Sequence, residues 1–144
     1  MSNKGDTAAG IQNKLVTQTA KLIEQARKFE EDCDCYKAGF ALGTILHFLQ
    51  DSYTLSHASR ESLGRITMFQ AFLLQSPTLH AREDVLKQHG DAFRLQVERS
   101  RQLLEVFETP DLTGDALINF LREEFYKLAP GAEVGETETW YAPR

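Results

Sequence analysis

The sequence contains only two cysteines, one tryptophan and four prolines among its 144 residues. Cys33 and Cys35 are separated by one residue, which is poor geometry for a structural disulfide, so nothing requires an oxidising compartment. No stretch approaches the ~18–20 apolar residues of a membrane-spanning helix, and the polar start MSNKGDTAAG is not typical of a signal peptide. The localisation is therefore left open, including secretion or delivery from a larger precursor.

Basic residues are also in the minority, because 16 Lys and Arg oppose 21 Asp and Glu, for a formal net charge of -5. This balance argues against binding of nucleic acid through a broad positively charged surface. It does not exclude an enzyme that holds a phosphodiester through a metal ion. A chain of this length is the size of one domain, and its 42% hydrophobic content is that of a globular protein.

Apolar residues recur at helical spacing in most of the chain, and we find neither a repeat nor a convincing alternating strand. The sequence therefore predicts an all-α fold, a compact multi-helix domain. We expect a flexible lead-in over residues 1–10, a single helical metal-binding domain over 11–128 and an extended tail over 129–144. The expected helices cover residues 11–31, 36–51, 77–89, 91–108 and 114–128.

The segment 36–51 is apolar nearly all round, so we expect it to form the central and most buried helix. Gly39 and Gly43 lie one helical turn apart on it. Two glycines at this spacing suit the close approach of another helix.

Histidines and aspartates form the pattern H-x3-D-x5-H-x22-H-x3-D. Its members are His47, Asp51, His57, His80 and Asp84, and they include three of the four histidines in the chain. In each H-x3-D pair the two side chains project from the same face of a helix, one turn apart. Imidazole nitrogens and carboxylate oxygens are ligands that zinc accepts, so the pattern predicts a zinc site.

More ordinary interpretations stand beside this one. A single His-x3-Asp pair on a helix is most often a surface pair, and only the recurrence of the pattern favours a metal. His89 fits no ligand spacing and is interpreted as a histidine at a helix end. Cys33 and Cys35, with the aspartates beside them, are interpreted as a solvated turn rather than as a second metal site.

The stretch LGTILHFLQDSYTLSHASR, with the later H-x3-D, resembles the zinc-dependent phospholipase C / S1–P1 nuclease superfamily over residues 36–108. The resemblance implies an all-α fold that holds a cluster of three zinc ions. It implies that His57, His80 and Asp84 hold one zinc. It also implies that His47 and Asp51 contribute to a second zinc, with Asp51 able to bridge to a third.

The chain departs from this family before His47, where it has neither the N-terminal tryptophan nor the upstream histidine ligands that family members carry. Three explanations stay open: the chain is the C-terminal part of a longer protein, it binds fewer metals, or its catalytic site is degraded. An upstream polypeptide or a partner would then complete the site. We expect one to three Zn2+ ions.

The function that the resemblance implies is hydrolysis of phosphoesters by metal-activated water, as in a phospholipase C, with phospholipid favoured over nucleic acid as substrate. The candidate catalytic residues are Asp51 and Arg60; Arg60 would bind a substrate phosphate, or it is an ordinary solvated loop arginine. One alternative is a nuclease of the P1 type. The other is a non-catalytic helical domain with a structural metal or a protein-binding role, from a larger protein or a toxin.

Overall fold

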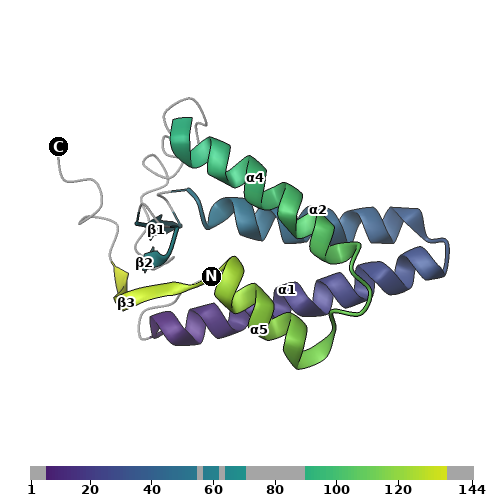
Figure 1. Cartoon of the computed structure of the whole chain (residues 1–144), viewed down its shortest axis with the longest axis horizontal. Helices are drawn as coiled ribbons and strands as arrows, with labels where there is room; N and C mark the ends of the chain where they lie inside the picture. The colour runs from purple at the N-terminus through teal and green to yellow at the C-terminus, as the bar shows by residue number, and fades with distance from the viewer. Residues whose placement is uncertain (1–5, 55–56, 62–63, 71–89, 136–144) are drawn as a thin grey trace.

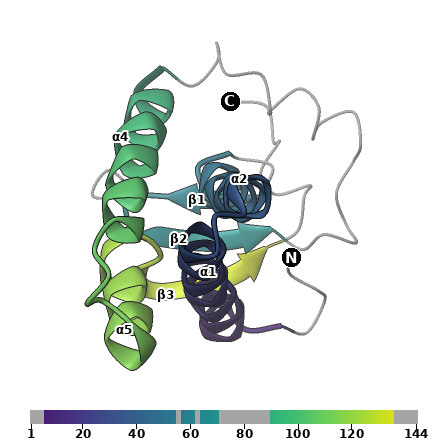
Figure 2. The same ribbon diagram turned by 90° about the vertical axis from the view of Figure 1, so that its right-hand side faces the viewer.

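The computed structural model describes residues 6–54, 57–61, 64–70 and 90–135, which form four helices and a small sheet. The helices are α1 (Ala8–Glu31), α2 (Cys35–Asp51), α4 (Gly90–Phe107) and α5 (Gly114–Glu124). The strands are β1 (Ala58–Arg60), β2 (Ile66–Gln70) and β3 (Leu128–Gly135). Helices α1 and α2 form a long hairpin, with the sheet at the end opposite its turn (Figure 1). Helices α4 and α5 lie along one side of this hairpin (Figure 2).

Short polar side chains start the two helices of the hairpin. The hydroxyl of Thr7 accepts a hydrogen bond of 3.0 Å from the amide of Gly10, so α1 begins three residues before the predicted position. The carboxylate of Asp34 likewise accepts a hydrogen bond of 3.1 Å from the amide of Lys37 at the start of α2. Between the helices Cys33 adopts a φ of 57°, a left-handed conformation that turns the chain back on itself.

The predicted all-α class is confirmed only in part: the described residues are mostly helical, but three strands in the order β1-β2-β3 correct it. Strand β2 pairs antiparallel with β1 and parallel with β3. Residues 129–135 of the predicted extended tail, together with Leu128 from the predicted helix before it, therefore form a strand that pairs with Ile66–Gln70. This pairing joins segments about 60 residues apart, which local periodicity does not reveal.

A second correction concerns α2, which was predicted to be the most buried helix. Four of its residues are buried, compared with seven in α1. Its aromatic residues Tyr36 and Phe40 are 83% and 72% exposed. No atom lies within 4 Å of where a Cβ would stand on Gly39 or Gly43, so within the described fold neither glycine serves the predicted close helix contact.

The core lies between the hairpin, α5 and the sheet. Its largest fully buried side chains include Ile23, Leu117, Leu121, Phe125 and Tyr126. The predicted helix over 114–128 ends at Glu124, and the next two residues turn inward before β3 begins. The predicted helix over 77–89 lies outside the described residues. None of the described helices is long and apolar enough to cross a membrane.

Tyr126 gives the core a testable dependence on pH. Burial raises the pKa of the Tyr126 phenol to about 12, although the hydroxyl of Thr19 and the guanidinium of Arg60 oppose the rise. An unfolded tyrosine has a pKa near ~10, so the folded state favours the neutral phenol. This contribution to stability is complete below about pH 10 and disappears as the pH rises through about 12, a loss of roughly 2–3 kcal/mol.

We therefore expect the free energy of unfolding to fall less steeply between about pH 10 and pH 12 in Tyr126→Phe than in the wild type. Chemical denaturation across this pH range measures the slope. Tyr36→Phe, which changes an exposed tyrosine, serves as the control and should keep the wild-type slope. Equal slopes in the wild type and Tyr126→Phe would contradict this account of the core.

Candidate metal-binding site at the end of helix α2

His47 and Asp51 lie one turn apart near the C-terminal end of α2. Nε2 of His47 is 3.4 Å from Oδ2 of Asp51. The imidazole is 69% exposed, whereas the carboxylate is 32% exposed. The helix thus fixes the aspartate at its end and leaves the histidine free to adopt other rotamers.

His57 approaches the same carboxylate from the segment that follows the helix. Backbone hydrogen bonds from Thr54 to Asp51 (3.0 Å) and from His57 to Thr54 (2.9 Å) turn the chain back towards α2. The carbonyl of His57 accepts a hydrogen bond of 2.9 Å from the amide of Gln70, the last residue of strand β2. His57 is 22% exposed at its side chain, and its Nε2 lies 3.8 Å from Oδ2 of Asp51. The carboxylate therefore lies near both imidazoles.

The spacing of these atoms can be compared with that of zinc ligands. Two ligand atoms at ~2.0–2.1 Å from a tetrahedral zinc are about 3.3–3.4 Å apart. The His47–Asp51 separation has this value, and the His57–Asp51 separation exceeds it by a few tenths of an ångström. Yet no group of three or more His, Cys, Asp or Glu in the described part of the chain is arranged so that it could hold a metal ion as it stands. The donor set fits zinc chemically, but it needs a shift of side chains or further ligands.

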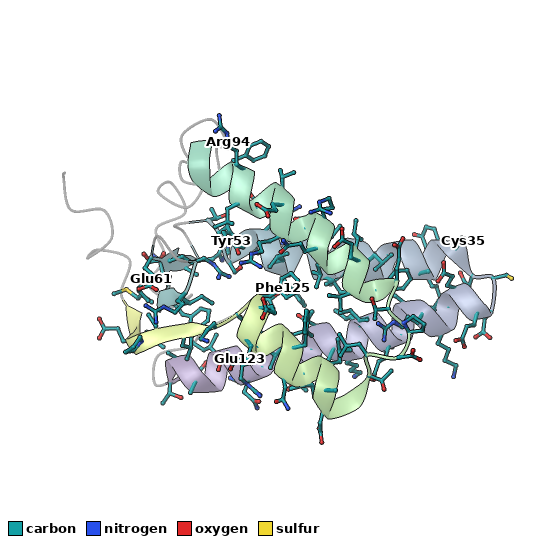
Figure 3. The ribbon with its side chains drawn as sticks, viewed as in Figure 1. Cys35, Tyr53, Glu61, Arg94, Glu123 and Phe125 are labelled. Atoms are coloured by element: carbon teal, nitrogen blue, oxygen red, sulfur yellow. The ribbon has the colours of Figure 1, made fainter. Side chains whose placement is uncertain are left out.

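The structure thus brings together three of the five predicted ligands: His47, Asp51 and His57. His80 and Asp84, the other two, lie outside the described residues, so their part in the site stays a prediction. Cys33 and Cys35 are exposed and form no disulfide. Figure 3 shows Cys35 at the end of α2 opposite the end that carries Tyr53, so this cysteine lies far from the imidazoles.

Arg60 is the last residue of strand β1, and its side chain forms hydrogen bonds within the protein. Its Nε donates to the carbonyl of Ser52 at 3.0 Å, and its Nη1 donates to the carbonyl of Gly64 at 2.6 Å. Its Nη2 donates to the hydroxyl of Ser52 at 2.7 Å and to the carbonyl of Phe125 at 3.0 Å. The guanidinium carbon lies 4.0 Å from the centre of the Tyr53 ring, in a cation–π contact.

These contacts bear on the predicted role of Arg60. Desolvation lowers the pKa of its guanidinium below the usual value, so the guanidinium is withdrawn from water and Arg60 is not a solvated loop arginine. Four hydrogen bonds already end on protein oxygens, so a substrate phosphate would have to compete with them. Phosphate binding by Arg60 stays a prediction, and its observed contacts are those of a structural residue.

One residue beside the site, Ser52, was not singled out from the sequence. Ser52 is buried, donates to the carbonyl of Leu49 at 2.6 Å and accepts from Arg60. Tyr53 covers the guanidinium of Arg60. The only signal in the sequence is the position of Ser52 directly after Asp51, since a serine after a helix often bonds to the last carbonyls.

A separate cleft of about 470 Å3 lies between α4 and α5. Its lining residues are Arg99, Gln102, Glu105, Val106, Thr109, Leu112, Phe120, Glu124 and Phe125. The three described candidate ligands, His47, Asp51 and His57, are not among these lining residues.

Comparison of the chain with protein-family models, with curated proteins and with solved structures finds no match.

Proposed function

We propose that this chain binds zinc at the end of α2 and hydrolyses phosphodiesters, in the manner of a phospholipase C. The observation that supports the proposal is the position of the Asp51 carboxylate, 3.4 Å from Nε2 of His47 and 3.8 Å from Nε2 of His57. A carboxylate shared by two imidazoles at these separations is a donor set that zinc accepts. The remaining ligands would be His80 and Asp84.

Each described residue would have a distinct part in the site. Asp51 would orient both imidazoles from a fixed position at the helix end. His57 is braced by backbone hydrogen bonds on both sides of it, so it would supply a preoriented nitrogen. His47 is the most exposed of the three and would move onto the metal from solvent. When bound, zinc polarises a phosphoryl oxygen and lowers the pKa of a water molecule towards ~7.

The net charge of -5 favours phospholipid over nucleic acid, because a polyanion gains little from an acidic protein. A structural metal without catalysis is the second candidate function. It is favoured by the contacts of Arg60, whose donors are engaged with the protein rather than directed at a substrate.

The first test of the proposal measures zinc. We expect wild-type protein to retain zinc after dialysis and His57→Ala to bind it much less tightly. Loss of a group that only hydrogen-bonds a metal ligand costs ~10–100-fold in metal affinity, so loss of the ligand itself should cost at least that much. His89→Ala removes the histidine that fits no ligand spacing and is the matched control. Equal zinc affinity in wild type and His57→Ala would contradict the proposal.

The same assay separates two arrangements of ligands. If the set implied by the family resemblance is correct, His80→Ala should remove more zinc than Asp51→Ala. If the described triad is the principal site, Asp51→Ala should remove more, because Asp51 is the neighbour of both His47 and His57.

Hydrolysis is measured on a chromogenic phosphodiester, on phospholipid vesicles and on single-stranded DNA. We expect weak turnover that a chelator stops, with the vesicles preferred over DNA. Zinc-loaded protein that turns over none of the three substrates would favour the structural metal instead.

A further inference from the structure

The outer face of α2 carries a row of exposed residues, which we call the α2 stripe: Tyr36, Gly39, Phe40, Gly43 and His47. Their spacing of three, one, three and four residues places them on one side of the helix. All five are exposed, with Tyr36 at 83% and Phe40 at 72%. The opposite face of α2 packs against the core through Ala38, Ala41, Ile45 and Leu49. The helix thus presents aromatic rings to solvent on its outer face.

We propose that the α2 stripe binds a second copy of this chain, with the two α2 helices packed antiparallel. The stripe is complementary to itself about a two-fold axis between Phe40 and Gly43. Around that axis each Phe40 meets the partner's Gly43, and each Tyr36 meets the partner's His47. Interfaces with two-fold symmetry use the same patch on both subunits. The large side chains of the patch must therefore pack against small residues of the same patch on the partner.

The glycines make this packing possible. No heavy atom lies within 4 Å of where a Cβ would stand on Gly39 or Gly43, so the space above both is open. A glycine lets a second helix approach closely and leaves a hollow for a ring. This arrangement would supply the close helix contact that two glycines one turn apart predict and that the described fold lacks.

The exposed apolar residues of α4 do not have this property. On α4, Phe93, Val97 and Leu104 are exposed, but the helix has no glycine between them and carries Arg94, Glu98 and Arg101 among them. The α2 stripe contains no Lys, Arg, Asp or Glu. A symmetric partner therefore fits α2 better than α4.

The exposed area sets the strength of the association. Aromatic side chains bury ~150–250 Å2 each, so the exposed fractions of Tyr36 and Phe40 correspond to about 230–390 Å2 in each copy. Two copies together would then bury about 450–800 Å2 through these rings, which is below the ~1,200 Å2 of a standard stable interface. The glycines and His47 add to this area. The dimer should therefore be weak and should depend on protein concentration in the micromolar range or above.

The test is sedimentation velocity over a series of protein concentrations. A chelator is kept in the buffer, so that the result does not depend on zinc or on the proposed activity. The wild type should change from monomer to dimer as concentration rises. Phe40→Ala and Gly43→Phe should each weaken the dimer at least ten-fold, because the first removes the ring and the second fills the hollow.

The double variant Phe40→Ala/Gly43→Phe exchanges the large and small positions of the stripe. In an antiparallel pair it recreates the ring-in-hollow contact, so it should recover most of the lost affinity. Val97→Ser, which removes an exposed apolar side chain from α4, is the matched control and should dimerise like the wild type. Circular dichroism of each variant checks that the helices are intact.

Three results would overturn the proposal. The first is a wild-type protein that stays monomeric at every concentration. The second is a dimer that Phe40→Ala leaves unchanged, since another surface would then form it. The third is a double variant that remains as weak as the single ones, since the helices would not then pair in the antiparallel register.

Discussion

Replacing Arg60 with methionine should lower the free energy of unfolding by about 2–4 kcal/mol. The guanidinium joins three parts of the chain, because it donates to Ser52 after α2, to Gly64 before β2 and to Phe125 after α5. Methionine has a similar length but no donors, so it would leave these oxygens without partners. An unpaired buried polar group costs ~1–3 kcal/mol. Removal of the desolvated charge offsets part of this cost, which is why the expected loss is smaller than the sum of the contacts.

Two further variants give the Arg60 experiment its controls. Arg60→Lys keeps the charge but cannot reproduce the planar fork, so its stability should lie between those of wild type and Arg60→Met. Arg101→Met removes an exposed arginine paired with Glu105 on α4, and it should change stability by less than ~0.5 kcal/mol. Denaturant unfolding followed by circular dichroism measures all three variants.

The outcome also decides between the two roles of Arg60. A structural role predicts that Arg60→Met loses stability and that its zinc affinity falls with it, because Ser52 directly follows Asp51. If Arg60→Met keeps wild-type stability but loses phosphodiester turnover, then Arg60 binds substrate and the structural interpretation is wrong.

The helices could be predicted from the sequence because their signals are local. The segments that became α1, α2, α4 and α5 have apolar residues at helical spacing, and the polar caps Thr7 and Asp34 lie at the starts of α1 and α2. Three of the eight predicted boundaries, Glu31, Asp51 and Gly114, coincide with the observed ones, and the other five differ by one to four residues, as is usual where helix ends are set by capping and by tertiary contacts.

The sheet could not be predicted, because its pairings are not local. Strand β1 has three residues, too few to show an alternating pattern, and β3 contains Pro130 and Gly131, which are unfavourable in strands. β3 is stabilised by its parallel pairing with β2, which the intervening helices bring within reach. The segment that forms β2, Ile66–Gln70, gives no decisive signal either, since a short apolar run fits either a helix or a buried strand.

The exposure of α2 was missed for a related reason. Its high apolar content predicts burial on all sides, yet Tyr36 and Phe40 face solvent in the described fold. Periodicity shows which residues share a face, but not whether another element of the same chain covers that face. For the candidate site, the helical spacing of His47 and Asp51 predicted their proximity correctly. The approach of His57 depended on a turn whose geometry the sequence only suggested.

Arg27 connects α1 to the corner between α4 and α5. Its Nε donates to the carbonyl of Phe107 at 3.0 Å, and its Nη1 donates to that of Leu112 at 2.8 Å. Its Nη2 donates to the carbonyls of Val106 at 2.7 Å and Thr109 at 2.8 Å. Desolvation lowers the pKa of the guanidinium, and the neighbouring charge of Glu24 opposes this. One side chain thus satisfies carbonyls at the end of α4 that have no partner within the helix.

Arg27→Met should therefore lower the free energy of unfolding by about 2–3 kcal/mol, because water can replace only some of the lost bonds at this partly exposed corner. Arg27→Lys should recover part of the loss, since an ammonium group reaches fewer of the four carbonyls. Lys28→Met changes the next residue, which is exposed, and serves as the matched control with a change below ~0.5 kcal/mol. Hydrogen exchange should show faster opening at the end of α4 in Arg27→Met, while α2 and its histidine site keep wild-type protection. If the amides of α2 lose protection to the same extent, Arg27 does not act on this corner alone, and the fold unfolds as one unit around it.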